Sequence, residues 1–170
     1  LPPQYGGGGR SPFARMVVVE ELLAAGAPVA AHWIADRQSG PLIAKYGTEE
    51  QKRFFLPKIC RAEAFFCIGM SEPNSGSDAA AMKTRAEKKG DRYVLNGTKM
   101  WITNGPDAQL IVVYAKTDPA AGSRGITTFI VETDRKGFKV AQKLDKMGMR
   151  GSSTGELVFE DCEIPEENVL

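Results

Sequence analysis

The stretch Arg61-Ala-Glu-Ala-Phe-Phe-Cys-Ile-Gly-Met-Ser-Glu-Pro-Asn-Ser-Gly-Ser-Asp78 marks the point at which the sequence changes its periodicity. Upstream of it, apolar residues recur at helical spacing. Downstream, the period is two, and turn-forming residues arrive about every eight to twelve residues, as in a sandwich or barrel. The sequence therefore predicts an α+β chain, with a helical segment over residues 1–61 and an all-β, sandwich-like or barrel-like domain over residues 62–170.

Capping signals define the expected helices. Ser11 followed by Pro12 is typical of an N-cap with proline in the first helical position, and a helix is predicted from there. A second helix is predicted over residues 27–38. The sequence Thr48-Glu-Glu-Gln51 is a capping box, in which the threonine and glutamine side chains each bind the other's backbone amide. It predicts the start of a third helix.

Eight strands are predicted in the second part, at residues 65–69, 82–87, 92–96, 99–103, 109–116, 126–132, 138–144 and 156–161. The segments between them are rich in turn-forming residues. The pair Asn96-Gly97 stands between two of these strands and predicts a tight hairpin turn.

Length and composition exclude several functional classes. The chain has 170 residues, of which 42% are hydrophobic and 25% charged, as in ordinary globular proteins. The formal net charge is +1, so no electrostatic surface for nucleic acid is expected. The longest uncharged apolar run, residues 22–35, is short and interrupted by glycine, proline and histidine, so no membrane span is expected.

Cysteine and histidine content excludes further chemistry. Cys60, Cys67 and Cys162 lack the paired spacing of zinc ligands, and His32 is the only histidine. Neither a metal site nor a Ser/His/Asp or Cys/His triad is predicted. We expect all three thiols to be reduced and structurally buried.

Two stretches combine residue types that suit a flat redox cofactor. Residues 69–78 bring serines, a glycine and successive backbone amides to the end of a strand, as in an anion-binding nest. In Lys99-Met-Trp-Ile-Thr-Asn-Gly105, Trp101 and Thr103 alternate onto one face of a predicted strand. An indole that packs on an apolar ring system, beside a hydroxyl that donates to a ring nitrogen, suits a flavin. The alternative interpretation is an ordinary polar loop and a core tryptophan.

Two glycine-rich stretches lack phosphate-binding patterns. Residues 6–9 follow no strand and have no G-x-G-x-x-G spacing, and residues 148–155 lack a Gly-Lys-Ser/Thr ending. Both are interpreted as loops.

Together, these motifs resemble the acyl-CoA dehydrogenase family, and most closely its isovaleryl-CoA dehydrogenase-like members and related bacterial members. Upstream, Pro3-Gln-Tyr-Gly-Gly7 and Tyr46-Gly-Thr-Glu-Glu-Gln-Lys52 extend the resemblance over essentially the whole chain. The pattern similar to the family's middle β-domain runs through Met70-Ser-Glu-Pro-Asn-Ser-Gly-Ser-Asp78, Trp101-Ile-Thr-Asn-Gly105 and Arg150-Gly-Ser-Ser-Thr-Gly-Glu-Leu-Val-Phe-Glu-Asp-Cys-Glu-Ile-Pro165.

The resemblance implies FAD as the cofactor. It places the Ser71 hydroxyl at the pyrimidine side of the flavin ring, Trp101 against the ring, and the Thr103 hydroxyl at N5. The residues that it places along the FAD are Ile68, Gly69, Met70, Ser71, Gly76, Ser77, Trp101, Ile102 and Thr103. The residues that it places against acyl-CoA are Ser77, Ser123 and Arg124, although for Arg124 an exposed loop arginine without a ligand is an equal alternative.

The implied reaction is the α,β-dehydrogenation of an acyl-CoA thioester. A carboxylate removes the α-proton, a hydride passes to flavin N5, and an electron-transfer flavoprotein then accepts the electrons. In the family this carboxylate lies in a C-terminal helical domain, which we expect to be absent from this chain, and none of Glu72, Glu87, Glu132 and Glu156 matches it. No catalytic residue is therefore assigned, and the 170-residue chain alone is expected to be inactive.

The resemblance also implies a cellular setting. The full-length parent is expected to be a homo-oligomer, dimeric or tetrameric, that acts in fatty acid or branched-chain amino acid catabolism in a bacterial cytoplasm or a mitochondrial matrix. Two alternatives remain: a flavin monooxygenase or nitroalkane oxidase-type enzyme on the same fold, and a non-catalytic β-sandwich binding module. Flavin affinity that survives replacement of both Trp101 and Thr103 favours the binding module.

Overall fold

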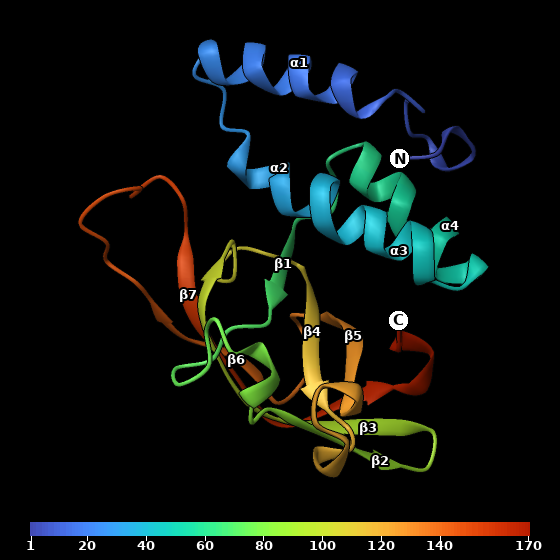
Figure 1. The fold of residues 1–170 in the computed structure, drawn as a ribbon, viewed down its shortest axis with the longest axis vertical. Helices are drawn as coiled ribbons and strands as arrows, with labels where there is room; N and C mark the ends of the chain where they lie inside the picture. Colours follow the sequence, from blue (N-terminus) through green and yellow to red (C-terminus); the bar gives the residue numbers. More distant parts are fainter. The chain divides into compact units, whose positions relative to one another are not determined.

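The computed structural model describes residues 1–170, with the side chain of Ala31 left aside. The chain divides into two compact units, Leu1–Phe65 and Phe66–Leu170. The first unit holds the α-helices and the second holds the strands (Figure 1). This order confirms the predicted α+β class, with helices first and the sheet after them.

The predicted capping signals start two of the helices. After a 3₁₀ turn at Pro3–Tyr5, α1 (Pro12–Ala24) begins where the Ser11 hydroxyl accepts the Ala14 amide at 3.2 Å. α4 (Glu49–Cys60) begins at the capping box. There the Gln51 amide donates to the Thr48 hydroxyl at 3.1 Å, and the Thr48 amide donates to the Gln51 side chain at 2.9 Å. These bonds satisfy amides that a helix N-terminus otherwise leaves without partners.

The middle of the helical unit is longer than the predicted helix over residues 27–38. α2 (Ala30–Ile34) continues through a π-helical turn (Ala35–Ser39) into α3 (Gly40–Tyr46), and Figure 1 shows one continuous run. α3 then lies beside α4.

Glycine explains why the helical run does not stop. The Gly40 amide donates to the Ala35 carbonyl across the π turn. A Cβ at Gly40 would lie only 2.8 Å from that carbonyl oxygen, so glycine permits this close approach. Pro41 follows in the first turn of α3, where proline is tolerated. Gly40 and Pro41 are therefore both part of the helical run.

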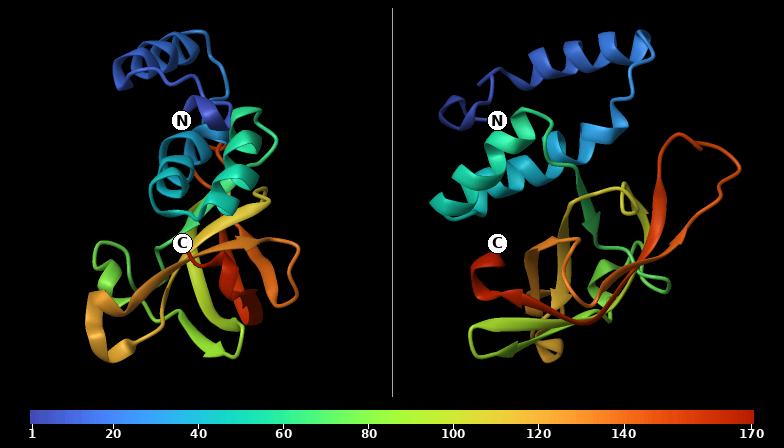
Figure 2. Two further views of the ribbon diagram at one scale, coloured as in Figure 1. Left: turned by 90° about the vertical axis from the view of Figure 1, so that its right-hand side faces the viewer. Right: turned by 180° about the vertical axis from the view of Figure 1, so that it is seen from behind.

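The second unit is a seven-stranded mixed sheet that curls around one core (Figure 2). Across the sheet the order is β1-β4-β2-β3-β7-β6, with β5 paired to β4. β1 and β4 run parallel, whereas β2–β3, β3–β7, β4–β5 and β6–β7 are antiparallel pairs. β6 is an edge strand, and its residues after Phe138 are exposed. The strands are β1 (Phe66–Gly69), β2 (Arg85–Lys89), β3 (Arg92–Thr103), β4 (Leu110–Lys116), β5 (Ile126–Glu132), β6 (Phe138–Lys143) and β7 (Thr154–Pro165).

The core of the sheet unit is apolar and aromatic. The fully buried Phe129 ring packs on Tyr93 with 5.0 Å between ring centroids, in an edge-to-face arrangement. Cys67 and Cys162 are buried in this core, as expected, whereas Cys60 on α4 is only partly buried. Burial raises the pKa of the Cys162 thiol to about 11.

The predicted hairpin at Asn96-Gly97 is wrong. β3 passes through both residues as one strand, and its register with β7 shifts between Leu95 and Gly97. The Asn96 side chain donates to Asp161 Oδ1 at 3.1 Å and accepts from the Asp161 amide at 2.9 Å. Gly97 has a φ of +150°, and a Cβ there would clash with the Thr84 hydroxyl oxygen. The Asn-Gly pair therefore serves a β-bulge instead of a turn.

Candidate functional site

The polar loop after β1 is folded onto itself. The Glu72 amide donates to the Ser75 carbonyl at 2.8 Å, and the Ser75 amide donates to the Glu72 carbonyl at 3.2 Å. The Ser75 hydroxyl donates to the Asp78 carbonyl. Glu72 and Ser75 are consequently buried, while the residues between them and those after Ser75 are exposed. The loop is a fixed structure that presents Gly76 and Ser77 to solvent.

This loop lies against β3. The Met100 amide donates to the Ser71 carbonyl at 2.9 Å, and the Lys99 ammonium donates to the Met70 carbonyl at 3.2 Å. The two stretches that the sequence analysis selects are therefore brought side by side. Their spacing in the sequence does not predict this contact, because it depends on how β3 is placed in the sheet.

β3 bulges just beyond the contact. Its register with β7 shifts between the Lys99–Leu157 and Ile102–Gly155 pairs, so β3 holds one extra residue there. Trp101, in the bulge, has a φ of +64°, and 61% of its surface is exposed. Ile102 packs into the core, and Thr103 is partly buried.

Trp101 carries two energetic costs. A left-handed backbone costs a non-glycine residue about 1–2 kcal/mol. Exposure of the indole also forgoes the gain from burying a large apolar side chain. Strained residues and bulges of this kind are typical of functional sites, where they direct a side chain toward a ligand.

A buried ion pair lies behind the loop. Lys99 Nζ is 2.8 Å from Glu72 Oε1, with the Lys99 side chain fully buried and that of Glu72 7% exposed. The Glu72 carboxylate also accepts the backbone amides of Lys83 at 2.6 Å and Thr84 at 2.9 Å. Sequence reasoning missed this pair because no local spacing connects its members. The available signal was that Lys99 is the one charged residue between positions 93 and 103.

The surroundings shift the pKa of both members of the pair. Burial alone would raise the pKa of Glu72, but the two amides and Lys99 together hold it below its ordinary value of 4.5. Burial lowers the pKa of Lys99, and the Glu72 carboxylate opposes that change.

The other predicted site residues occupy different environments. Ile68, Met70 and Ser71 are partly buried and Gly69 is buried at the end of β1. Ser123 and Arg124 are exposed on the 3₁₀ stretch Pro119–Gly125. That stretch contacts the short 3₁₀ helix Ala79–Ala81, which follows the polar loop. The glycine-rich residues 148–155 also reach the site, since the Asn104 amide donates to the Ser153 carbonyl at 2.8 Å.

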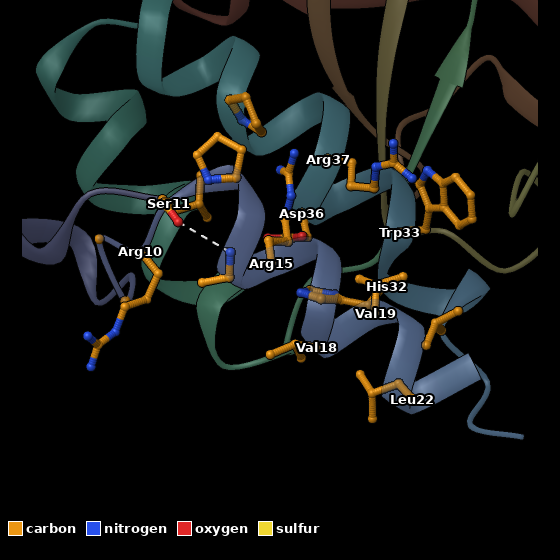
Figure 3. Close-up of a pocket in the computed structure, with 17 residues that line it drawn as sticks. Arg10, Ser11, Arg15, Val18, Val19, Leu22, His32, Trp33, Asp36 and Arg37 are labelled. Atoms are coloured by element: carbon orange, nitrogen blue, oxygen red, sulfur yellow. Dashed lines mark hydrogen bonds between the residues drawn. The ribbon is translucent and has the colours of Figure 1, made fainter. Parts of the chain in front are cut away.

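A separate hollow of about 480 Å³ lies within the helical unit (Figure 3). Val18, Val19 and Leu22 of α1 form its apolar wall. The Arg37 guanidinium lies 4.4 Å from the centroid of the Trp33 ring. None of the residues that the sequence analysis assigns to the site lines this hollow.

Known proteins match both units. Residues 1–63 match the family described as the acyl-CoA dehydrogenase N-terminal domain, and residues 67–162 match the acyl-CoA dehydrogenase middle domain. The mitochondrial isovaleryl-CoA dehydrogenase of Pongo abelii is 50% identical over 172 residues, which span 99% of this chain and 41% of that protein. The chain thus spans about two fifths of the length of the curated relatives it matches.

Solved structures agree with the sequence matches. The crystal structure of acyl-CoA dehydrogenase from Geobacillus kaustophilus superposes with a TM-score of 0.92 at 43% identity, over 100% of this chain and 45% of that one. A chain from a study of the electron transferring flavoprotein of Acidaminococcus fermentans superposes with a TM-score of 0.90 at 41% identity, over 100% and 45%. In the described part of this chain, no helix is both long enough and apolar enough to cross a membrane. From the matches of both units, we conclude that the chain belongs to the acyl-CoA dehydrogenase family.

Proposed function

We propose that this chain forms the flavin- and acyl-CoA-binding surface of an FAD-dependent acyl-CoA dehydrogenase, which carries out α,β-dehydrogenation of an acyl-CoA thioester. The observation that carries the proposal is Trp101, an exposed tryptophan held at a φ of +64° in a bulge next to Thr103 and the polar loop. An apolar ring system is the ligand that such an indole would cover.

The residues present fit a flavin. When bound, FAD supplies the acceptor for the hydride that leaves the substrate. Trp101 would cover one face of the ring system, and the Thr103 hydroxyl would donate to a ring nitrogen. A donor placed where charge develops is typically worth about 3 kcal/mol of barrier. Since the Ile102 side chain lies in the core, this residue would contact the flavin through its backbone.

The polar loop would bind the rest of the flavin ring. The Met100 amide donates to the Ser71 carbonyl, and this bond fixes the backbone from which the Ser71 side chain extends. No atom lies within 4 Å of a Cβ built on Gly76, which leaves open space for a ligand to approach the backbone. The residues that we propose along the cofactor are Ile68, Gly69, Met70, Ser71, Gly76, Ser77, Trp101, Ile102 and Thr103.

The acyl-CoA would meet the exposed side of the same loop. Ser77 is exposed at the loop, and Ser123 and Arg124 are exposed on the neighbouring 3₁₀ stretch. The Arg124 guanidinium offers a permanent positive charge and several donors, which suit the phosphates of coenzyme A.

We assign no catalytic base among these residues. Glu72 lies next to the loop, but its carboxylate is buried and bound by two amides and a lysine. A carboxylate stabilised in this way is a weak base and cannot reach a substrate. We therefore propose that the base is not among the 170 residues and that these residues alone do not turn over acyl-CoA.

The relatives support part of the wider setting that we propose. We propose residues 1–61 and 62–170 as the functional domains, an electron-transfer flavoprotein as the electron acceptor, and a homo-oligomeric parent. The structural neighbour from the Acidaminococcus study supports that acceptor. The curated relatives are named as mitochondrial, which supports a mitochondrial matrix, or otherwise a bacterial cytoplasm, as the location.

Flavin binding tests the proposal. FAD is titrated into the 170-residue chain, with and without isovaleryl-CoA, and flavin fluorescence is recorded. We expect binding that a Trp101→Ala, Thr103→Ala variant loses. The matched control is Trp33→Ala, which removes the only other tryptophan and lies in the helical unit. A folded double variant with unchanged FAD affinity would refute the assignment.

A further inference from the structure

We propose that the buried Glu72–Lys99 pair is the positioning element of the site, which fixes the loop at Ser71 and the bulge at Trp101 relative to each other. The inference rests on the proposed function, because it gives these two residues a role in the flavin- and acyl-CoA-binding surface. Neither residue is proposed to touch a ligand.

The pair connects three segments of the chain. Lys99 Nζ donates to Glu72 Oε1 at 2.8 Å and to the Met70 carbonyl at 3.2 Å, and it lies 3.9 Å from Met82 Sδ. Glu72 accepts the amides of Lys83 and Thr84, which lead into β2. The polar loop, the approach to β2 and the centre of β3 therefore share one buried polar cluster, and a shift of any one segment breaks bonds to the others.

The position of Lys99 in β3 explains why this cluster matters for Trp101. The Lys99–Leu157 pair is the last in regular register before the bulge, and Trp101 follows two residues later. The next amide, that of Met100, donates to the Ser71 carbonyl at 2.9 Å. Lys99 thus fixes β3 directly before the two residues that matter for the site. These are Met100, which binds the loop, and Trp101, which carries the indole.

The absence of a side chain at Gly69 leaves room for the Lys99 side chain. A Cβ built on Gly69 would lie 3.3 Å from Lys99 Cγ, which is tighter than an ordinary contact. The aliphatic part of the lysine therefore passes close over the end of β1, directly before the polar loop. The close fit favours a glycine at the end of β1, although glycine within a strand weakens the strand itself.

Stability alone does not explain this arrangement. Desolvation of two charges commonly offsets their attraction, and well-packed apolar residues in their place are often equally stable or more stable. The best-attested use of a buried polar pair is to specify one register among alternatives. A bulged strand needs such a specification, because a shift by one residue turns its side chains to the other face.

The experiment follows the position of Trp101 without any flavin. In a Trp33→Phe background Trp101 is the only tryptophan, so its emission and its quenching by acrylamide report on its environment alone. Three forms of the 170-residue chain are compared: the unchanged pair, the variant Glu72→Gln, Lys99→Met, and the control Glu160→Gln, Lys139→Met. The control removes an ion pair of 2.9 Å in the same unit whose members are both exposed. Thermal unfolding and FAD affinity are measured on the same samples.

We expect the control to retain the Trp101 signal, the unfolding midpoint and the FAD affinity. The Glu72→Gln, Lys99→Met variant should remain folded, alter the quenching of Trp101, and bind FAD about tenfold more weakly. A conservative Glu72→Asp variant, which keeps the charge but shortens the side chain, should lie between the two.

Two results would overturn the inference. One is a folded Glu72→Gln, Lys99→Met variant whose Trp101 quenching and FAD affinity match the control. The other is a variant that does not fold, because the pair would then be a requirement of the fold and not of the site. Absence of FAD binding by the unchanged chain would count against the proposed function only, since the flavin-free fluorescence decides the positioning role separately.

Discussion

Helix α1 and the sheet unit bury their apolar residues very differently. α1 has no buried residue, and its Phe13 is 75% exposed. The sheet unit encloses one continuous core, in which Phe129, Leu157 and Ile111 are fully buried. Packing therefore determines the conformation of the sheet unit, whereas α1 receives little stabilisation from buried side chains. The sheet unit can consequently support strained or charged residues at its site.

The largest expected loss of stability comes from a substitution in the core of the sheet unit. Phe129→Ala removes a fully buried ring that packs on Tyr93, so we expect a loss of about 3–5 kcal/mol in the free energy of unfolding. Urea unfolding followed through Trp101 measures it. Val140→Ala on the exposed β6 is the matched control, and a similar loss in that control would contradict the contrast between core and edge.

A smaller effect should appear on acidification. Because the pKa of Glu72 is lowered from 4.5 in the folded chain, its ionised form stabilises the fold. That stabilisation is complete above pH 4.5 and is lost as the pH falls through the lower, folded-state pKa. The difference in unfolding free energy between the unchanged chain and Glu72→Gln should therefore shrink below pH 4.5. Denaturant titrations at several pH values test this, and a difference that stays constant would contradict it.

The sequence predicted helices followed by strands, and most strand positions, because periodicity is local. Prediction from sequence failed where the conformation of a residue depends on hydrogen bonds that local periodicity does not reveal. Asn96-Gly97 has the composition of a turn, yet the Asn96 side chain is bound to Asp161, a residue far along the chain. The predicted second helix ends at residue 38, yet the helical run continues through a π turn into Gly40–Tyr46. Both errors arise because the same residues that form turns also permit bulges and irregular helical hydrogen bonds.

Prediction of the site from sequence is limited in the same way. Resemblance to a family selects Ser71, Trp101 and Thr103, but sequence alone predicts neither the left-handed φ of Trp101 nor the Glu72–Lys99 pair. A bulge appears only when two strands are paired, and the pair joins residues that are 27 positions apart.

In the helical unit a smaller effect should come from a cap. Thr48→Ala removes the acceptor of the Gln51 amide and disrupts the capping box of α4, which costs about 1 kcal/mol. Unfolding followed through Trp33, in a Trp101→Phe background, measures the helical unit. Thr48→Ser keeps the acceptor and should restore most of the stability, so a serine variant as unstable as the alanine one would argue against the cap.

The smallest expected change in stability comes from a substitution on α1, and it tests the contrast between α1 and the sheet core. Phe13→Ser replaces an aromatic side chain that is mostly exposed, so the free energy of unfolding of the 170-residue chain should change by no more than about 0.5 kcal/mol. The same Trp33 measurement applies. A loss close to that of Phe129→Ala would show that α1 is packed in solution.

The exposed β6 has a consequence for solution behaviour. An edge strand offers unpaired amides and carbonyls to the edge of another molecule, which is a common route to aggregation. Lys139 and Lys143 lie on this strand, and Lys139 Nζ is 2.9 Å from Glu160 Oε1. Two copies that approach edge to edge would bring these lysines together, and their repulsion weakens as salt is added. Association of two copies through this edge should therefore be weakest in buffers of low ionic strength.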